Sequence, residues 1–321
     1  MVALSIIISS RCDTYLQRTV DDLLNKAEGE VEVIVVLDGI WPDPMLKDSL
    51  RVNIVHQGEF HDNLGMRAAI NAGVRLSRGQ YIMKVDEHVM MSPGYDKRLI
   101  SICEDEWIIV PRRYRLDADK WEIINDGRNP IDYMIIDYPY QRPHDKTCGL
   151  HGAEDAERYK TRKDIEVDDL MTMQGSAYFC KKTYWEKLFP DGMDEENYGP
   201  FTQEAQEVSM TAWLSGGRVV VDKGCYYCHL HKGSKHGKGY GFSTTQYKRH
   251  MVSMEKGRLY CINKWLYTTD YKYDFEWLLK KFWPIKGWTD SWKEDIIRDR
   301  EYDYSTLNYE GDYWLGGLRE S

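Results

Sequence analysis

Residues 63–88 read NLGMRAAINAGVRLSRGQYIMKVDEH, and this stretch passes from a helix through a turn into a strand. The segment Asn63–Ser77 is typical of a helix, and Gly79 suits the position just after its C-terminus. Gln80–Val85 has the length and apolar character of a buried strand. This strand runs directly into the polar residues 86–88, Asp-Glu-His. The stretch therefore predicts a helix–strand unit with chemically active side chains at the carboxyl end of the strand.

The preceding sequence repeats the same alternation of strand and helix. Leu4–Ser9 and Val31–Leu37 are apolar runs of strand length, and Tyr15–Leu24 between them has apolar residues at helical spacing. Val52–Val55 predicts a further short strand. Strands that alternate with helices are typical of an α/β fold with a parallel, doubly wound sheet.

Polar residues follow three of these predicted strands: Asp13, Asp38 and the Asp-Glu-His stretch 86–88. Ligands of doubly wound sheets bind beyond the carboxyl ends of the strands, so these residues predict a nucleotide-type crevice. The first strand is not followed by G-x-G-x-x-G, and the sequence has no Walker A loop. By motif, the chain is therefore neither a dinucleotide-binding nor a P-loop protein.

Composition excludes some classes of protein. The formal net charge of −9 argues against a general nucleic-acid binder, which is usually basic. The first residues, MVALSIIISSRCD, lack a basic region and a small-residue cleavage site, and their apolar run is too short to span a membrane. We therefore expect a cytoplasmic protein without a membrane span, whose seven cysteines are reduced.

The stretch GCYYCHLHKG, residues 224–233, contains C-x-x-C-H, which is compatible with haem attachment, a redox pair or half a zinc site. A reducing compartment argues against covalent haem, and no second C-x-x-C completes a zinc site of the paired type. On a strand, Cys225 and Cys228 face opposite sides because their spacing is odd. A zinc or redox protein stays an alternative, and His229 and His231 need another explanation.

Asp86 and His88 predict a metal site. If the chain is extended there, alternate residues point the same way, so both side chains lie on one face. An aspartate with two histidines suits Mn²⁺ or a similar divalent ion, for which a nucleotide diphosphate is a natural ligand. The alternative is an ordinary turn aspartate followed by a surface histidine.

Three stretches resemble family 2 nucleotide-sugar glycosyltransferases with the GT-A fold, and especially the polypeptide N-acetylgalactosaminyltransferase branch. They are residues 5–24 (SIIISSRCDTYLQRTVDDLL), residues 65–95 around the Asp-Glu-His motif, and residues 203–233 (QEAQEVSMTAWLSGGRVVVDKGCYYCHLHKG). The resemblance covers about residues 3–233. It implies a Rossmann-like, mostly parallel sheet flanked by helices, and a D-x-H motif that binds Mn²⁺ or Mg²⁺.

The resemblance also implies roles for single residues. The metal ligands would be Asp86, His88 and His229, with His231 as a rival to His229 because it would share its face. Ser9, Asp13 and Asp38 resemble positions that hold the uracil and ribose of the donor. Arg67 lies where the family often places a basic residue near the donor phosphates, and Gly175 matches a glycine on the acceptor side. Turn chemistry, a solvated helix face and a strand bulge are the structural alternatives for these donor and acceptor residues.

The helix beginning near Thr202 departs from the family pattern. Inverting members carry Glu-Asp and the retaining branch carries Glu-Asn, whereas this chain has Glu204 followed by Ala205. Alanine cannot act as a general base. The departure favours retention, or a base supplied by Glu204 or Glu207. Acids in the first turn of a helix can also serve only to stabilise it.

We divide the chain into a GT-A domain, residues 1–233, and a basic flexible loop with a helical, aromatic-rich C-terminal extension, residues 234–321. The segment Lys232–Arg249 is rich in glycine, lysine and arginine, and resembles a lid over the diphosphate. The aromatic stretch FWPIKGW, residues 282–288, is similar to tails of phage-encoded transferases and is a candidate acceptor contact.

The sequence thus predicts a metal-dependent glycosyltransferase that moves a sugar from a nucleotide donor, a UDP-sugar by resemblance, to a hydroxyl group. The acceptor could be a glycan, a lipid-linked precursor or a hydroxymethylated base of phage DNA. The alternative is that the chain is not an enzyme but an inactive GT-A module that binds a nucleotide or glycan. Ala205, which cannot act as a base, favours this alternative.

Overall fold

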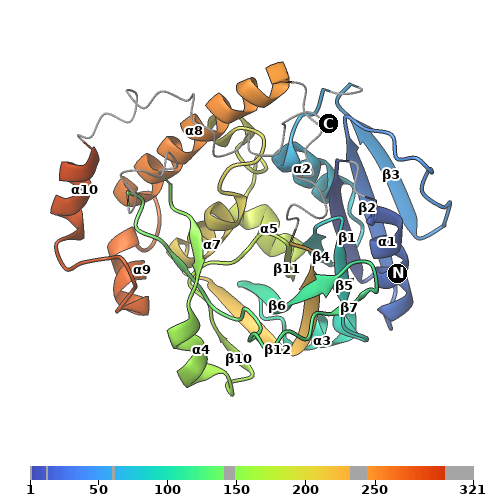
Figure 1. The fold of residues 1–321 in the computed structure, drawn as a ribbon, viewed down its shortest axis with the longest axis horizontal. Helices are drawn as coiled ribbons and strands as arrows, with labels where there is room; N and C mark the ends of the chain where they lie inside the picture. Colours follow the sequence, from blue (N-terminus) through green and yellow to red (C-terminus); the bar gives the residue numbers. More distant parts are fainter. Residues whose placement is uncertain (1, 12–13, 60–61, 141–148, 232–243, 301–321) are drawn as a thin grey trace.

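A computed structural model describes residues 2–11, 14–59, 62–140, 149–231 and 244–300 (Figure 1). The strands are β1 (Leu4–Ser10), β2 (Val31–Asp38), β3 (Val52–Gln57), β4 (Tyr81–Val85), β5 (Val89–Met91), β6 (Trp107–Asp117), β7 (Glu122–Ile123), β8 (Met134–Ile136), β9 (Gly152–Glu154), β10 (Val167–Asp169), β11 (Ala177–Lys181) and β12 (Arg218–His229). The helices are α1 (Leu16–Lys26), α2 (Met66–Leu76), α3 (Tyr95–Ile102), α4 (Ala156–Arg162), α5 (Lys182–Leu188), α6 (Glu195–Tyr198), α7 (Glu204–Leu214), α8 (Thr244–Tyr267), α9 (Phe275–Phe282) and α10 (Trp292–Arg300).

The main sheet has the strand order β10-β12-β6-β11-β4-β1-β2-β3. Strands β1 to β4 pair in parallel, in the order β3-β2-β1-β4 of a doubly wound nucleotide-binding half. β11 runs antiparallel to both β4 and β6, so β6 and its parallel partner β12 point the same way as β4. The predicted α/β fold with a mostly parallel central sheet is confirmed, with β10 and β11 as reversed strands on this path.

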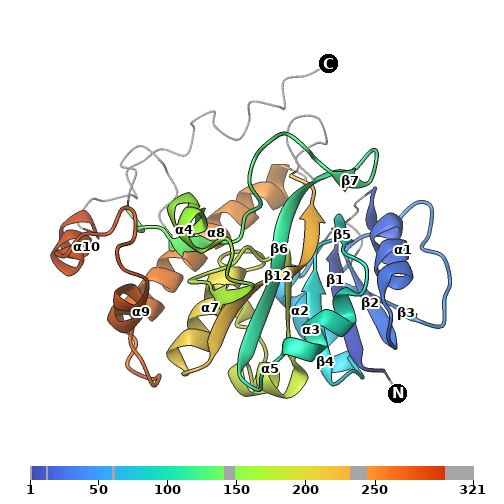
Figure 2. The same cartoon turned by 90° about the horizontal axis from the view of Figure 1, so that it is seen from below.

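Helices cover both faces of this sheet (Figures 1 and 2). The alternation of side chains along β2 explains how. Ile34 and Val36 pack with Ala69 of α2 in one small cluster. Val33, Val35 and Leu37 point the other way and join the main core, which includes the apolar stripe of α1. A strand that is apolar at every position is thus buried on both sides, as parallel strands usually are.

The helical C-terminal extension is confirmed, and its aromatic residues pack into the main core. Phe282 and Trp288, the ends of the FWPIKGW stretch, are buried, and Trp288 Nε1 donates a hydrogen bond of 2.8 Å to the carbonyl of Ile136. Core packing therefore explains these two rings without an acceptor. The proposed division between residues 233 and 234 lies outside the described residues, but α8 and α9 beyond it share one hydrophobic cluster with the sheet.

Two element boundaries differ from the sequence-based expectations. The sequence pattern predicts two strands, residues 218–222 and 226–230, but they form one strand, β12, with an irregularity between Asp222 and Tyr226. Helix α7 begins at Glu204, and its N-cap position is Gln203, with φ of 55° and no capping hydrogen bond from its side chain, rather than Thr202. Among the described residues, no helix combines the length and the apolar character that crossing a membrane requires.

Candidate metal centre

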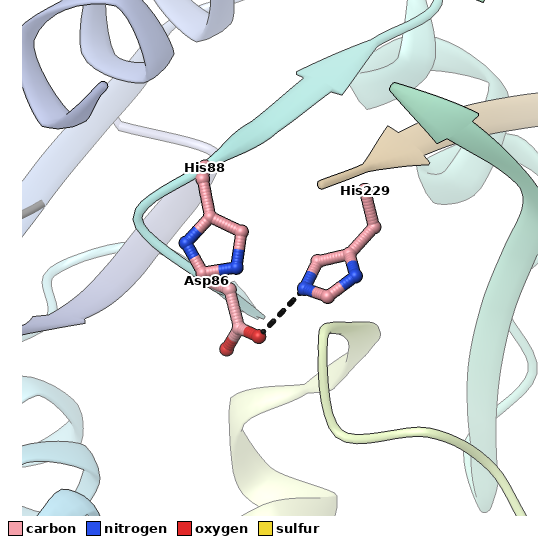
Figure 3. Close-up of side chains that lie close together, drawn as sticks. All are labelled: Asp86, His88 and His229. Carbon is pink, nitrogen blue, oxygen red and sulfur yellow. Dashed lines mark hydrogen bonds and ion pairs between the residues drawn. The ribbon is translucent and has the colours of Figure 1, made fainter. Parts of the chain in front are cut away.

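Asp86, His88 and His229 come together where β4 and β12 end (Figure 3). Asp86 follows β4 directly, and His88 lies in the turn between β4 and β5. β5 then pairs with the end of β12, with Val89 opposite His229. Residues 86–88 form a turn rather than the extended chain we expected, so the two ligand candidates converge through the turn and not through strand alternation.

The geometry of the three side chains suits one shared cation. One candidate ligand atom from each residue lies within 4.8 Å of the others. His229 Nε2 is 3.1 Å from Asp86 Oδ2, and the rings of His88 and His229 have centroids 4.7 Å apart. The sequence-based expectation that an aspartate and two distant histidines meet at one edge of the sheet agrees with this arrangement.

Neighbouring elements hold the turn in place. Glu87 accepts hydrogen bonds from the Ser10 hydroxyl and, at 2.9 Å, from the backbone N–H of Arg11, so it ties the turn to the end of β1. The Thr19 hydroxyl of α1 donates to the Glu87 carbonyl at 3.0 Å and accepts from the Val89 N–H at 3.1 Å. The backbone that carries Asp86 and His88 is therefore fixed on both sides.

The protonation states of the cluster suit a cation. Burial alone would raise the pKa of Asp86, but Lys84 and His229 outweigh it and hold that pKa well below its usual range. Burial lowers the pKa of His229 to about 3, against the opposing effect of Asp86. At neutral pH the site thus offers an ionised carboxylate and a neutral His229 imidazole. These are donors that a divalent ion such as Mn²⁺ or Mg²⁺ can use.

Lys84 also contacts this cluster, and it is not among the residues predicted from the sequence. Its side chain is 2% exposed. Its Nζ lies 2.5 Å from Asp86 Oδ1 and also donates to the carbonyl of Gly175. Burial would lower the pKa of Lys84, but the carboxylates of Asp86 and Glu204 raise it, so the ammonium stays charged. A lysine inside the apolar strand YIMKV, two residues before Asp86, was the signal that could have revealed it.

Gly175, which resembles a glycine on the acceptor side of the family, has a carboxylate beside it. A Cβ placed on Gly175 would be 2.0 Å from Glu204 Oε2. Glu204 is almost fully buried, next to Tyr178 and Lys84, and burial raises its pKa despite the opposing effect of Lys84. The missing side chain at position 175 therefore makes room for Glu204. Lys84 links the two acids, because it is hydrogen-bonded to Asp86 and its charge also attracts Glu204.

Replacing Gly175 with alanine is expected to displace the Glu204 carboxylate, because the end of this flexible side chain is the atom that must move. We expect a crystal structure of Gly175→Ala to have Glu204 in another rotamer with the fold intact. Gly152→Ala, where φ is not in the left-handed region and an added Cβ comes no closer than 3.0 Å to any neighbouring side-chain atom, is the control. An unchanged Glu204 rotamer in Gly175→Ala would contradict this account of the glycine.

Arg67 and Glu207 do not reach the cluster as the sequence analysis proposed. Arg67 is fully buried and forms an ion pair with Glu207, which is 2% exposed. The guanidinium also donates to the carbonyl of Thr202 at 2.5 Å and stacks on Tyr198, 4.2 Å from the ring centroid. A fully buried guanidinium that is already paired with a carboxylate and a carbonyl is not accessible to a donor phosphate in this conformation. A carboxylate paired with Arg67 is likewise a poor candidate for a general base.

Two of the expected donor-binding residues, Ser9 and Asp38, lie near the carboxyl ends of β1 and β2. Asp38 ends β2, and its carboxylate accepts hydrogen bonds of 2.8 Å from the N–H groups of both Leu64 and Gly65. It therefore organises the entrance to α2, which is the turn chemistry weighed above. Ser9 is half-buried near the end of β1. Asp13 lies outside the described residues.

The cysteines beside His229 do not form a site. Cys225 and Cys228 are free, buried thiols that pack in two different hydrophobic clusters, as their odd spacing predicts. Burial raises the pKa of each thiol to about 12, which makes a reactive thiolate unfavourable. His231, the rival ligand, is exposed and contacts Arg113 instead of joining the donor cluster. Most of the Lys232–Arg249 lid lies outside the described residues.

Comparison with known proteins agrees with this architecture. Residues 5–155, just under half of the chain, match the sequence model of glycosyl transferase family 2. EpsH of Bacillus subtilis (strain 168), a provisionally named glycosyltransferase, is 27% identical over 113 residues, which are 33% of this chain and 32% of EpsH. EpsJ of the same organism, an uncharacterised glycosyltransferase, is 29% identical over 99 residues, which are 29% of this chain and 27% of EpsJ. The chain thus spans about a third of the length of these relatives.

The solved structure of GalNAc-T7 with UDP, GalNAc and Mn²⁺ superposes with a TM-score of 0.59 at 15% sequence identity, and covers 85% of this chain and 49% of that chain. At this identity the likeness establishes the fold alone, which is of the GT-A type. The fold and the family match together support a glycosyltransferase.

Proposed function

We propose that this protein is a metal-dependent glycosyltransferase that moves a sugar from a nucleotide diphosphate donor, a UDP-sugar, to a hydroxyl group. The convergence of Asp86, His88 and His229 at the edge of a GT-A sheet carries this proposal. A divalent cation held there, Mn²⁺ or Mg²⁺, would neutralise the diphosphate as it leaves. The bound UDP and Mn²⁺ of the GalNAc-T7 structure favour the same donor and metal.

The residues around the cluster favour a retaining reaction. Position 205 carries alanine, and Glu207 is occupied by Arg67, so neither can take the proton of the acceptor. We propose that the acceptor oxygen attacks the anomeric carbon while the bond from that carbon to the phosphate oxygen breaks on the same face. The leaving phosphate then accepts the acceptor proton. Glu204, which is buried near Lys84, is the alternative base for an inverting reaction.

The acceptor class stays open among a glycan, a lipid-linked precursor and a modified DNA base. The second candidate function is that of an inactive nucleotide-binding module. It is favoured by Ala205, whose side chain cannot act as a base. Turnover separates the two. A binding module would bind UDP with metal but would neither hydrolyse nor transfer the sugar of a UDP-sugar.

The test measures the melting temperature of the protein with UDP, with and without Mn²⁺. A ligand that binds only the folded state raises the melting temperature as its concentration exceeds the dissociation constant. We expect UDP to stabilise the protein only when Mn²⁺ is present, and we expect His229→Ala to abolish this stabilisation.

The matched control is His231→Ala, which removes a neighbouring imidazole outside the donor cluster and should keep the metal-dependent shift. A shift that is independent of metal, or one that His231→Ala abolishes while His229→Ala does not, would mean that the ligands are assigned wrongly. Release of free sugar from a panel of UDP-sugars in the presence of Mn²⁺ then identifies the donor.

A further inference from the structure

Two arginines of β6 lie on the same side of the sheet as the candidate metal ligand His229. In the pairing of β6 with β12, Arg113 is opposite Tyr227 and Arg115 is opposite His229. Tyr227 and His229 are two residues apart on β12, as Arg113 and Arg115 are on β6, so all four side chains share one face. The strand β6 therefore presents two positive charges beside the metal cluster.

Neither guanidinium forms an ion pair with a described residue. Within the described part of the chain, no carboxylate lies within ion-pair distance of Arg113 or Arg115, whereas the adjacent Arg112 forms a two-bonded ion pair with Asp132. Arg113 is 3% exposed, and its Nε has no hydrogen-bond partner. Its Nη2 contacts the ring of His231, which is exposed. Arg115 donates only a 3.3 Å hydrogen bond to the carbonyl of Asn129.

A buried cation without a counter-ion is unfavourable, because the protein replaces neither its hydration nor its charge balance. Burial, together with the repulsion from Arg115, lowers the pKa of Arg113 despite the attraction of Tyr227, Glu154 and Asp86, so these groups compensate its positive charge only in part. An anion would satisfy the open donors. Phosphate fits best, because the planar fork of a guanidinium matches two phosphate oxygens.

We propose that Arg113 and Arg115 form a subsite for a phosphate group on the acceptor side of the metal cluster. The carboxyl ends of β1 and β2 form the crevice where the nucleotide of a doubly wound fold binds, and β6 lies beyond β4 and β11 from that crevice. The phosphate therefore belongs to a phosphorylated acceptor. This assignment to the acceptor rests on the proposed sugar transfer. His231 is the exposed side chain in contact with Arg113, and its rotation would open the guanidinium to the ligand.

The first experiment uses inorganic phosphate and the metal-free protein in EDTA, so that it does not depend on the metal cluster. We expect phosphate to raise the melting temperature relative to chloride at equal ionic strength, and Arg113→Gln to weaken the apparent phosphate affinity about tenfold, as the loss of a charged hydrogen bond predicts. Arg75→Gln removes the same charge from the exposed surface of α2 and should bind phosphate normally. His229→Ala should also retain phosphate binding, because the metal-free measurement does not depend on the proposed metal site.

The second experiment asks whether the arginines bind a phosphate of the acceptor or the diphosphate of the donor. It repeats the phosphate titration with saturating UDP and Mg²⁺. Binding of inorganic phosphate in addition to UDP, with UDP affinity unchanged in Arg113→Gln, supports an acceptor subsite. Competition between UDP and phosphate, or equal loss of both in Arg113→Gln, would assign the arginines to the donor and overturn the proposal. Absence of phosphate binding to the wild type would also overturn it. If Arg113→Gln does not fold, Arg115→Gln replaces it, because Arg115 is only half-buried. We expect the same loss of phosphate affinity.

Discussion

Asp86→Asn is expected to weaken Mn²⁺ binding about a hundredfold or more and to abolish the metal-dependent stabilisation by UDP. The substitution replaces the only anionic donor of the cluster with a neutral amide of the same shape. Loss of a supporting residue alone typically lowers metal affinity by about 10–100-fold, so loss of a direct ligand should cost at least as much. Electron paramagnetic resonance of free Mn²⁺ in a titration measures the affinity directly, without any activity assay.

The same substitution should lower the stability of the metal-free protein, because Lys84 keeps its buried charge and loses its ion-pair partner, which leaves it with the weaker attraction of Glu204. A hydrogen bond to a charged group contributes about 1.5–3 kcal/mol, which is the expected loss in the free energy of unfolding. Adding Lys84→Met to Asp86→Asn should restore much of the stability but none of the Mn²⁺ affinity. Normal Mn²⁺ affinity in Asp86→Asn would contradict the ligand assignment. A double variant as unstable as Asp86→Asn would contradict the role of Lys84.

Arg67→Met is expected to destabilise the fold by about 3–5 kcal/mol, the usual cost of removing one partner of a buried ion pair. Arg67 and Glu207 are both almost fully buried, and the substitution leaves Glu207 with Lys264, whose Nζ is 3.7 Å from Glu207 Oε1. Burial already raises the pKa of Glu207, and only the positive charges of Arg67 and Lys264 oppose this effect. Urea denaturation at neutral pH measures the loss.

A double-mutant cycle separates the ion pair from the packing of the Arg67 side chain. Arg67→Met combined with Glu207→Leu removes both charges, so the pair of substitutions should cost clearly less than the sum of the single ones. Costs that simply add, or an Arg67→Met variant within about 1 kcal/mol of the wild type, would contradict the view that this pair links α2 to α7. The result would also bear on Arg67 as a donor ligand, since a residue that binds phosphate should affect UDP affinity more than stability.

The sequence predicted those parts of the fold that depend on local pattern. The apolar runs of β1, β2 and β4 and the helical spacing of α1 and α2 are visible in the chain, and alternation alone implies the parallel half of the sheet. The resemblance to a known family placed His229, 143 residues from Asp86, beside it. Periodicity could not have done so, because nothing local to His229 distinguishes it from His231.

The contacts that the sequence did not predict depend on partners far apart in the chain. The sequence suggests Arg67 as a donor ligand because its position on a helix is visible, whereas its pairing with Glu207, 140 residues later, is not. The resemblance places Gly175 on the acceptor side, whereas the side chain that fills the space beside it belongs to α7. Lys84 could have been noticed from its place in an apolar strand, but its partner Gly175 could not.

The pairing of β5 with the end of β12 has a consequence for the synthesis of the protein on the ribosome. Two of the three donors, Asp86 and His88, leave the ribosome well before His229, because synthesis proceeds from the N-terminus. Until β12 has been added beside β6, the nascent chain presents a carboxylate and one imidazole without the third donor. Under the proposed function, we therefore expect the cation to bind only after the sheet is complete, and an unfinished chain to bind it weakly.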